Sequence, residues 1–403
     1  MRRYPLSNAK FTWRWLFSSV KKWPGTQRLL VLCGTLSICG CVEPYQPPEV
    51  QENVDLLVVD GFLDMSTGSA TVRLSHAISL SSATAAAPES GATVAILDAS
   101  GTSYGLIETA PGTYAIDELV LDPASKFMLS LRTANGVEYI SDYSEPLPTP
   151  PIDSVTWSGD EDGLTILVNA HDATRVAQYY YWDYIETWKY NAQVSSEFIF
   201  INGTPEYRTN DQRIHTCWQT QESTKISIAS VERLAENVIH EFPVTFIPKG
   251  STKLSVTYSI LVRQRAISKQ EYNFLEQLQK TTESLGGLFD PQPSQVLGNI
   301  HGVTNSSHPV LGYFSAGMLT EERIFVDFYD LPDPIRKYYP MAGCEVDTVE
   351  VADLGRLLES TILGTAIYSE SGATIIAYTI SIPRCADCRT QGGVLEKPPF
   401  WPN

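Results

Sequence analysis

Residues 127–136 read Phe-Met-Leu-Ser-Leu-Arg-Thr-Ala-Asn-Gly and carry the plainest strand signal in the chain. Apolar side chains at Phe127, Leu129 and Leu131 repeat every second residue, which is the period of a strand with one buried face. The Asn-Gly pair that follows predicts a tight hairpin turn, because both residues tolerate positive φ. The segment therefore indicates an antiparallel sheet.

The same pattern extends over residues 54–147. Short apolar runs at 56–59, 70–75 and 91–97 are each bounded by turn residues, and a Pro-Gly pair at 111–112 begins another strand. Strands at this spacing, with no helical period, predict a β-sandwich. The order of strands and turns is similar to Ig-like and transthyretin-like sandwiches, which usually act as spacers or docking modules.

A proline-rich segment, Glu-Pro-Leu-Pro-Thr-Pro-Pro at 145–151, places a domain boundary after residue 147. Proline fixes φ and lacks a backbone donor, so neither sheet is expected to cross the segment. Residues 148–403 predict a larger β-rich domain, which makes the protein mainly β. One helix is expected over 268–285, because Ser268-Lys269-Gln270-Glu271 is a capping box ahead of an apolar stripe.

Residues 179–190 form a dense aromatic run, Tyr-Tyr-Tyr-Trp-Asp-Tyr-Ile-Glu-Thr-Trp-Lys-Tyr. In a strand, five of its aromatic side chains share one face. One interpretation is a platform that stacks sugar or peptide rings. The favoured one is the inner face of a sandwich, where aromatic residues supply much of the buried area. Glu186 interrupts the row and is its one sign of exposure. The five residues are Tyr180, Trp182, Tyr184, Trp188 and Tyr190.

The first 40 residues contain seven basic residues and no acidic ones, and a short apolar run lies at 29–38. A membrane-spanning helix needs about 20 apolar residues, so a secretory signal is predicted over 1–40. The signal ends in Ile38-Cys39-Gly40-Cys41, which is similar to a bacterial lipobox with Cys41 as the lipid acceptor. An ordinary signal peptide with incidental cysteines is the alternative. Residues 41–53, with three prolines and three glutamates, are typical of an extended tether.

The composition excludes two classes of protein. Hydrophobic residues make up 43% and charged residues 19% of the 403 residues, which excludes wholesale disorder. The net charge is −17, and it becomes −24 when the seven basic residues of the predicted signal are removed. Such an acidic chain is not expected to bind nucleic acid through phosphate contacts.

Four cysteines lie beyond the predicted lipid acceptor. In an exported protein they predict up to two disulfides, with three possible pairings. A redox Cys-x-x-Cys motif and a zinc site are the alternatives, but the first needs a helix start beside a βαβ unit and the second four ligands. We expect each member of the Cys-x-x-Cys pair to bond a distant cysteine and so to fasten the tail. The four are Cys217, Cys344, Cys385 and Cys388.

No metalloprotease, nucleophile-elbow or phosphate-loop motif appears, and the six histidines are scattered. We therefore expect no enzymatic activity, no cofactor and no metal. Two short segments, Asp153-Ser154-Val155 and Asp347-Thr348-Val349, resemble an O-glycosylation motif. Their acceptors would be Ser154 and Thr348.

Several segments in order resemble one known family. They are the lipobox at Cys41, the segment at 258–293, Gly-Asn-Ile at 298–300, Leu-Gly-Tyr-Phe-Ser-Ala at 311–316, and the Cys-Ala-Asp-Cys-Arg tail ending in Lys-Pro-Pro-Phe-Trp. Together they resemble the Bacteroidetes lipoprotein family catalogued as domain of unknown function 4249. That family has no assigned activity, so no catalytic residue carries over. Its members often lie beside TonB-dependent transporters, which implies an accessory surface lipoprotein.

These observations predict a lipid-anchored protein at the outer surface of the outer membrane. Its expected role is that of a non-enzymatic accessory or binding subunit of a TonB-dependent nutrient transporter, with a glycan or a peptide as ligand. The alternative is a structural or envelope-assembly lipoprotein without a small-molecule ligand. Exposure of Trp182 and Trp188 in a cleft would favour the first role, and their full burial the second.

Overall fold

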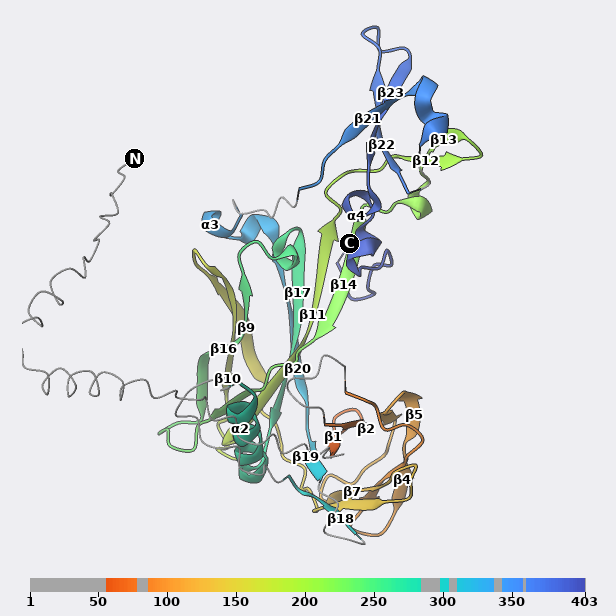
Figure 1. Ribbon diagram of the computed structural model, residues 1–403. Helices are drawn as coiled ribbons and strands as arrows, with labels where there is room; N and C mark the ends of the chain where they lie inside the picture. The colour runs from red at the N-terminus through yellow and green to blue at the C-terminus, as the bar shows by residue number, and fades with distance from the viewer. Residues whose placement is uncertain are drawn as a thin grey trace, which may run out of the picture. The chain divides into compact units, whose positions relative to one another are not determined.

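The computed structural model describes residues 56–77, 86–283, 298–303, 310–336, 343–357 and 360–402. The chain divides into a unit at residues 1–54, which lies outside the described residues, and a unit at residues 55–403. The second unit is mainly β, as predicted, and its sheets are drawn in Figure 1. In the described ranges, no helix is both long and apolar enough to span a membrane.

The first hydrophobic core lies between two five-stranded sheets. Eight of their strands come from the N-terminal part of the unit: β1 (Leu57–Asp64), β2 (Ser69–His76), β3 (Thr93–Asp98), β4 (Ser103–Gly105), β5 (Ile107–Ala110), β6 (Thr113–Ile116), β7 (Phe127–Arg132) and β8 (Glu138–Ser141). Phe127, Leu129 and Leu131 of β7 are all buried in this core, as the two-residue period predicts. The arrangement is sandwich-like, because strands of both sheets contribute to one core.

Two further strands come from much later in the sequence, β18 (Ile300–Gly302) and β19 (Val310–Gly317). The sheet orders are β19-β1-β2-β6-β5 and β18-β8-β7-β3-β4. β19 runs parallel to β1 from Leu57↔Val310 to Asp64↔Gly317, and its Phe314 is fully buried in the first core. The sandwich is therefore built from two separate parts of the chain, not from residues 54–147 alone.

The second and largest core lies between two other sheets. One has the order β16-β10-β9 and the other β14-β11-β17-β20, with β15 paired to β11. Inward side chains of both sheets form a single cluster that includes Leu164, Trp182 and Ile260. The strands are β9 (Ile152–Gly159), β10 (Gly163–His171), β11 (Tyr179–Asn191), β14 (Thr216–Glu222), β15 (Ser227–Ser230), β16 (Val238–Pro248), β17 (Thr257–Ala266) and β20 (Thr320–Asp327).

Helix α2 (Lys269–Glu283) corresponds to the helix predicted at 268–285. The Oγ of Ser268 accepts a hydrogen bond from the backbone N–H of Glu271 at 3.1 Å, as the capping box predicts. The carboxylate of Glu271 does not complete the box. It lies 3.2 Å from the guanidinium of Arg265 on β17 and accepts from Ser315 Oγ at 3.1 Å. A buried cation attracts this carboxylate more strongly than a backbone amide does.

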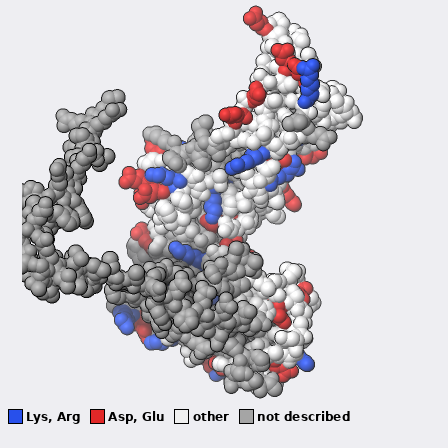
Figure 2. Space-filling model, in the orientation of Figure 1, with Lys and Arg blue, Asp and Glu red and all other residues white. Residues whose placement is uncertain are grey.

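A third, small core lies between two further sheets. The sequence predicted them only as part of the larger domain at 148–403. One is a hairpin of β12 (Phe198–Ile201) and β13 (Thr204–Tyr207), and the other has the order β21-β23-β22. Phe198 packs edge-on against Tyr378 with ring centroids 4.9 Å apart. The remaining strands are β21 (Asp347–Glu350), β22 (Ile362–Tyr368) and β23 (Ile375–Ser381), and the short helices are α3 (Asp333–Arg336) and α4 (Pro383–Ala386). On the face drawn in Figure 2, acidic and basic side chains are interspersed.

Candidate functional site

The aromatic row of β11 is part of the second core. Its five side chains have relative exposures of 0% for Tyr180 and Trp182, 7% for Tyr184, 4% for Trp188 and 2% for Tyr190. Trp182 also donates from Nε1 to Oε1 of Gln264 at 2.9 Å. None of these rings offers a face to a ligand, so the stacking platform is corrected to a sandwich core. Period-two aromatics pack against the facing sheet because burial of their large surface stabilises the fold.

Glu186 does not mark an exposed edge of that row. Its carboxylate is 4% exposed, accepts from Tyr258 Oη at 2.7 Å, and forms an ion pair with Lys253. The ammonium of Lys253 also lies 5.0 Å from the centroid of the Trp188 ring. A buried charge is tolerated when it is paired and hydrogen-bonded, and Glu186 meets both conditions.

The four candidate cysteines form two disulfides, Cys217–Cys388 and Cys344–Cys385. Each member of the Cys-x-x-Cys pair is bonded to a distant cysteine, as expected. The first bond connects residues 171 positions apart and the second residues 41 positions apart. The C-terminal tail is therefore covalently fastened to β14 through Cys388.

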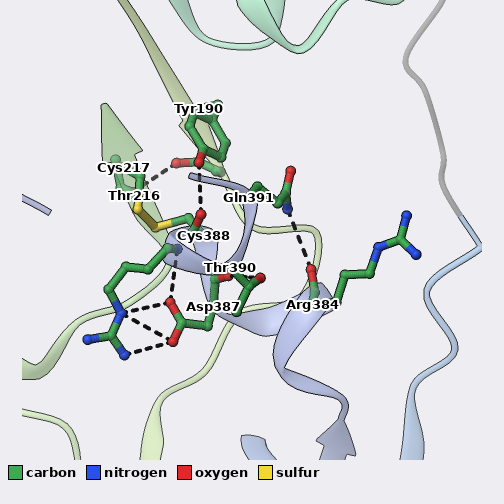
Figure 3. The surroundings of a disulfide bond; sticks show 10 residues. Tyr190, Thr216, Cys217, Arg384, Asp387, Cys388, Thr390 and Gln391 are labelled. Atoms are coloured by element: carbon green, nitrogen blue, oxygen red, sulfur yellow. Dashed lines mark hydrogen bonds and ion pairs between the residues drawn. A yellow bond between two sulfur atoms is a disulfide. The ribbon is translucent and has the colours of Figure 1, made fainter. Parts of the chain in front are cut away.

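Polar contacts hold the tail in place around Cys388 (Figure 3). Tyr190 Oη donates to the carbonyl of Cys388 at 2.8 Å, and Asp387 pairs with Arg389 through Nη2 at 2.7 Å. Gly393 lies so close to β11 that a Cβ there would sit 2.3 Å from Tyr190 Oη. Farther along, Trp218 of β14 and Val394 exchange two backbone hydrogen bonds of 2.9 and 2.8 Å. The tail thus extends the edge of β14.

A cavity of about 780 Å³ opens beside this junction. Its walls come from residues 195–197 after β11, residues 207–211 after β13, the start of β14, and tail residues 395–396. A volume of this size is within the usual range for small-ligand sites, roughly 300–1,000 Å³. The disulfide and the tail contacts fix the relative positions of two of these walls.

Arg208 is a partly buried cation in the wall of the cavity. Its Nε donates to Ser196 Oγ at 2.9 Å and its Nη1 to the carbonyl of Gln212 at 3.1 Å, and both acceptors are neutral. Among the described residues, no carboxylate forms an ion pair with Arg208 and none accepts from its Nη2. Burial lowers the pKa of Arg208, the charge of Asp387 opposing this effect. Partly buried cations are usually paired with an anion, but Asp387 acts on Arg208 only through its charge and forms no ion pair with it.

Two further basic groups line the same cavity, Arg213 and His215. Arg213 is exposed, and its side chain has no hydrogen-bond partner among the described residues. Burial lowers the pKa of the His215 imidazole, so the ring is neutral at pH 7. The cavity can therefore offer two guanidinium groups and a neutral imidazole to an incoming ligand.

The rim of the cavity has a different chemistry. Glu197, Asp211 and Glu396 are exposed carboxylates, and a hydrogen bond from Thr209 lowers the pKa of Asp211. Leu395 and the ring of Trp218 add apolar surface. The cavity thus combines basic groups, an acidic rim and an apolar wall. Ser196 Oγ donates to the carbonyl of Leu363 at 2.7 Å, so its proton is used in a structural hydrogen bond.

No sequence motif predicted this cavity. One stretch of eleven residues, 208–218, contains Arg208, Arg213, His215 and Trp218. It also contains Cys217, which is bonded to Cys388 of the tail. The density of basic and aromatic residues beside Cys217 is the sequence feature that could have indicated the cavity.

The remaining predicted site residues have separate surroundings. Thr348 is exposed on β21, whereas Ser154 is half-buried and accepts from Asn169 Nδ2 at 3.2 Å. O-glycosylation at either residue stays a prediction. Cys41 lies outside the described residues. Within the described ranges, no three His, Cys, Asp or Glu side chains are grouped to hold a metal ion.

A family model described as "Domain of unknown function (DUF4249)" matches residues 42–323. The chain belongs to this family. The match covers the sandwich and most of the second core, and it ends before the tail that carries Cys385 and Cys388. No curated protein matches the DUF4249 chain.

Two solved structures are similar to parts of the DUF4249 chain. The chicken interferon gamma receptor alpha chain shares 11% identity over 51% of this chain and 85% of its own, with a TM-score of 0.16. The adhesin InvE of Yersinia pseudotuberculosis shares 11% identity over 79% of this chain and 68% of its own, with a TM-score of 0.14. Similarities this low carry no argument about fold or function.

Proposed function

We propose that this DUF4249 chain is a lipid-anchored accessory subunit that binds a ligand for a TonB-dependent transporter of the outer membrane. The observation that carries the binding role is the cavity beside Cys217–Cys388, whose Arg208 forms no ion pair among the described residues. The anchor at Cys41 and the transporter come from the sequence and from the family resemblance. They are part of the proposal.

The construction of the cavity supports binding. The covalent bond to β14 and the two hydrogen bonds between Trp218 and Val394 hold the tail wall before any ligand arrives. A preformed site loses less conformational entropy on binding than one that must be ordered. Basic groups and apolar surface in one cavity are typical of sites that orient a small ligand.

A structural envelope lipoprotein is the second candidate. The burial of Trp182 and Trp188 favours this candidate, because the buried rings offer no aromatic surface for nutrient capture. The two candidates differ in one respect that can be tested directly, which is stable association with a transporter.

Co-purification of the full chain tests the proposal. The chain would carry a tag at its C-terminus, be extracted from outer membranes in mild detergent, and be analysed with its bound proteins by mass spectrometry. The proposal predicts a TonB-dependent transporter in near-equal amount. Recovery of the chain alone, or with envelope-assembly proteins, would favour the structural candidate. A Cys41→Ala chain recovered from the soluble fraction is the control for membrane-dependent contacts.

A further inference from the structure

We propose that the cavity beside Cys217–Cys388 binds short peptides through their C-terminal carboxylate, held by Arg208 and Arg213. This inference rests on the proposed binding role but not on the transporter. It assigns a chemical class to the ligand and a task to residues that no sequence motif singles out.

The first step concerns the charge of Arg208. Its Nε and Nη1 are engaged by the neutral acceptors Ser196 Oγ and Gln212 O, which hold the guanidinium plane in a fixed orientation. Nη2 then remains available to a ligand. A charge-assisted hydrogen bond from this nitrogen to a carboxylate is about twice as strong as a neutral one.

The second step concerns the local chain path. Arg208 directly follows β13, and Arg213 ends the short 3-10 turn Asn210–Gln212, whose last carbonyl accepts from Arg208. This turn carries both arginines to the same cavity. An anion bound in this cavity can therefore be stabilised by both guanidinium groups.

The third step distinguishes a peptide from a simple anion. The rim carboxylates Glu197, Asp211 and Glu396 would repel a ligand that is anionic throughout. They would attract the ammonium group of a peptide whose carboxylate is held by the arginines. The apolar surface of Trp218 and Leu395 suits an aliphatic or aromatic side chain between these two ends. An acidic sugar shares the carboxylate but lacks the opposite charge.

The fourth step concerns His215. Its ring lines the cavity, burial lowers its pKa, and a hydrogen bond with the backbone of Ala192 opposes this effect. The ring nitrogen that is not bonded to Ala192 can accept a hydrogen bond from a peptide N–H. It therefore suits the peptide backbone better than it suits a second carboxylate.

The test uses the full chain in detergent and native mass spectrometry. The ligands are a pool of tripeptides Ala-X-Ala with free carboxylates, the same pool with C-terminal amides, and D-glucuronate. We expect retention of the free acids and at least about tenfold weaker retention of the amides, since one charge-assisted hydrogen bond is worth about a factor of ten. Equal retention of acids and amides, or no retention of the acids, would overturn the proposal. Retention of glucuronate without the peptides would overturn the peptide assignment.

Variants locate the site. Arg213→Gln removes a charge without removing any hydrogen bond among the described residues, so it should fold normally and still weaken peptide binding about tenfold. Arg208→Gln should weaken it further. Arg233→Gln, an exposed arginine outside this cavity, is the matched control and should bind as the parent does. Unchanged binding in Arg213→Gln would contradict the proposal. Because co-purification with a transporter is scored separately, failure of either claim leaves the other measurable.

Discussion

The guanidinium of Arg265 lies 3.2 Å from the carboxylate of Glu271, and the exposures of the two side chains are only 12% and 4%. The same guanidinium lies 4.6 Å from the ring centroid of Phe62 on β1 and 4.4 Å from that of Tyr181 on β11. One cation therefore contacts strand β1 of the sandwich, strand β11 and helix α2. Burial raises the pKa of Glu271, and the charge of Arg265 opposes this rise.

Replacing Glu271 by Gln should destabilise the protein strongly. The substitution leaves the charge of Arg265 buried without its partner, which typically costs about 3–5 kcal/mol. Denaturant unfolding of the full chain measures the loss. Glu276→Gln is the matched control, because Glu276 pairs with Lys280 on the exposed side of the same helix and such pairs contribute only about 0.5 kcal/mol. Similar losses in both variants would show that Arg265 does not depend on Glu271.

The two disulfides should differ in their contribution to stability. In the chain-entropy model a loop of 171 residues gains about 5 kcal/mol and one of 41 residues about 4 kcal/mol. We therefore expect Cys217→Ser with Cys388→Ser to lower the unfolding midpoint more than Cys344→Ser with Cys385→Ser. The first pair should also abolish peptide retention, because it releases a wall of the cavity. A larger loss in the second pair would contradict this order.

Much of the fold follows from local patterns. The two-residue period of β7 and the capping serine Ser268 both predict what the structure shows, because each depends on neighbours a few residues away. The partner of Glu271 could not be predicted in the same way. Arg265 lies six residues earlier on a strand, and only the packing of β17 against α2 brings its side chain to the carboxylate.

The pairing of β19 with the sandwich strand β1 could not be predicted from the sequence either. Nothing near Phe314 indicates that its strand pairs with β1, more than 240 residues earlier, because parallel pairing leaves no turn between the partners. The cavity was missed for a similar reason. Its tail wall meets β14 through the bond between Cys217 and Cys388, and the sequence allowed three pairings.

The pKa values of two histidines should be shifted in opposite directions from the ordinary value. The hydrogen bond and charge of Asp153 raise the pKa of His171 above the ordinary 6.5, whereas burial lowers the pKa of His215 below 6.5. His171 therefore stabilises the fold fully below pH 6.5 and loses this effect as the pH rises through its folded-state pKa. His215 acts in reverse: its contribution is present above pH 6.5 and is lost as the pH falls.

NMR of the full chain labelled at histidine Cε1 measures both values. The variants His171→Asn and His215→Asn identify the two signals by their disappearance. Midpoints on the same side of 6.5 would contradict the surroundings described for one of the rings.

Cys41→Ala should release the protein from the membrane. The predicted lipid acceptor is the only covalent link to the membrane in the proposal, and acyl chains supply about 0.8 kcal/mol per buried CH₂ group. Fractionation followed by mass spectrometry of the N-terminal peptide is the measurement. We expect a lipid-modified Cys41 in the parent chain and a soluble Cys41→Ala variant. An unmodified cysteine, or a variant that stays in membranes that lack the transporter, would refute the anchor.

The most direct test of the central claim is an experimental structure of the full chain with the tripeptide Ala-Leu-Ala added at saturating concentration. The account predicts that the peptide lies in the cavity beside Cys217–Cys388, with its terminal carboxylate within hydrogen-bond distance of Arg208 Nη2 and its ammonium toward the acidic rim. A cavity without peptide, or a peptide bound with its carboxylate away from Arg208 and Arg213, would contradict it.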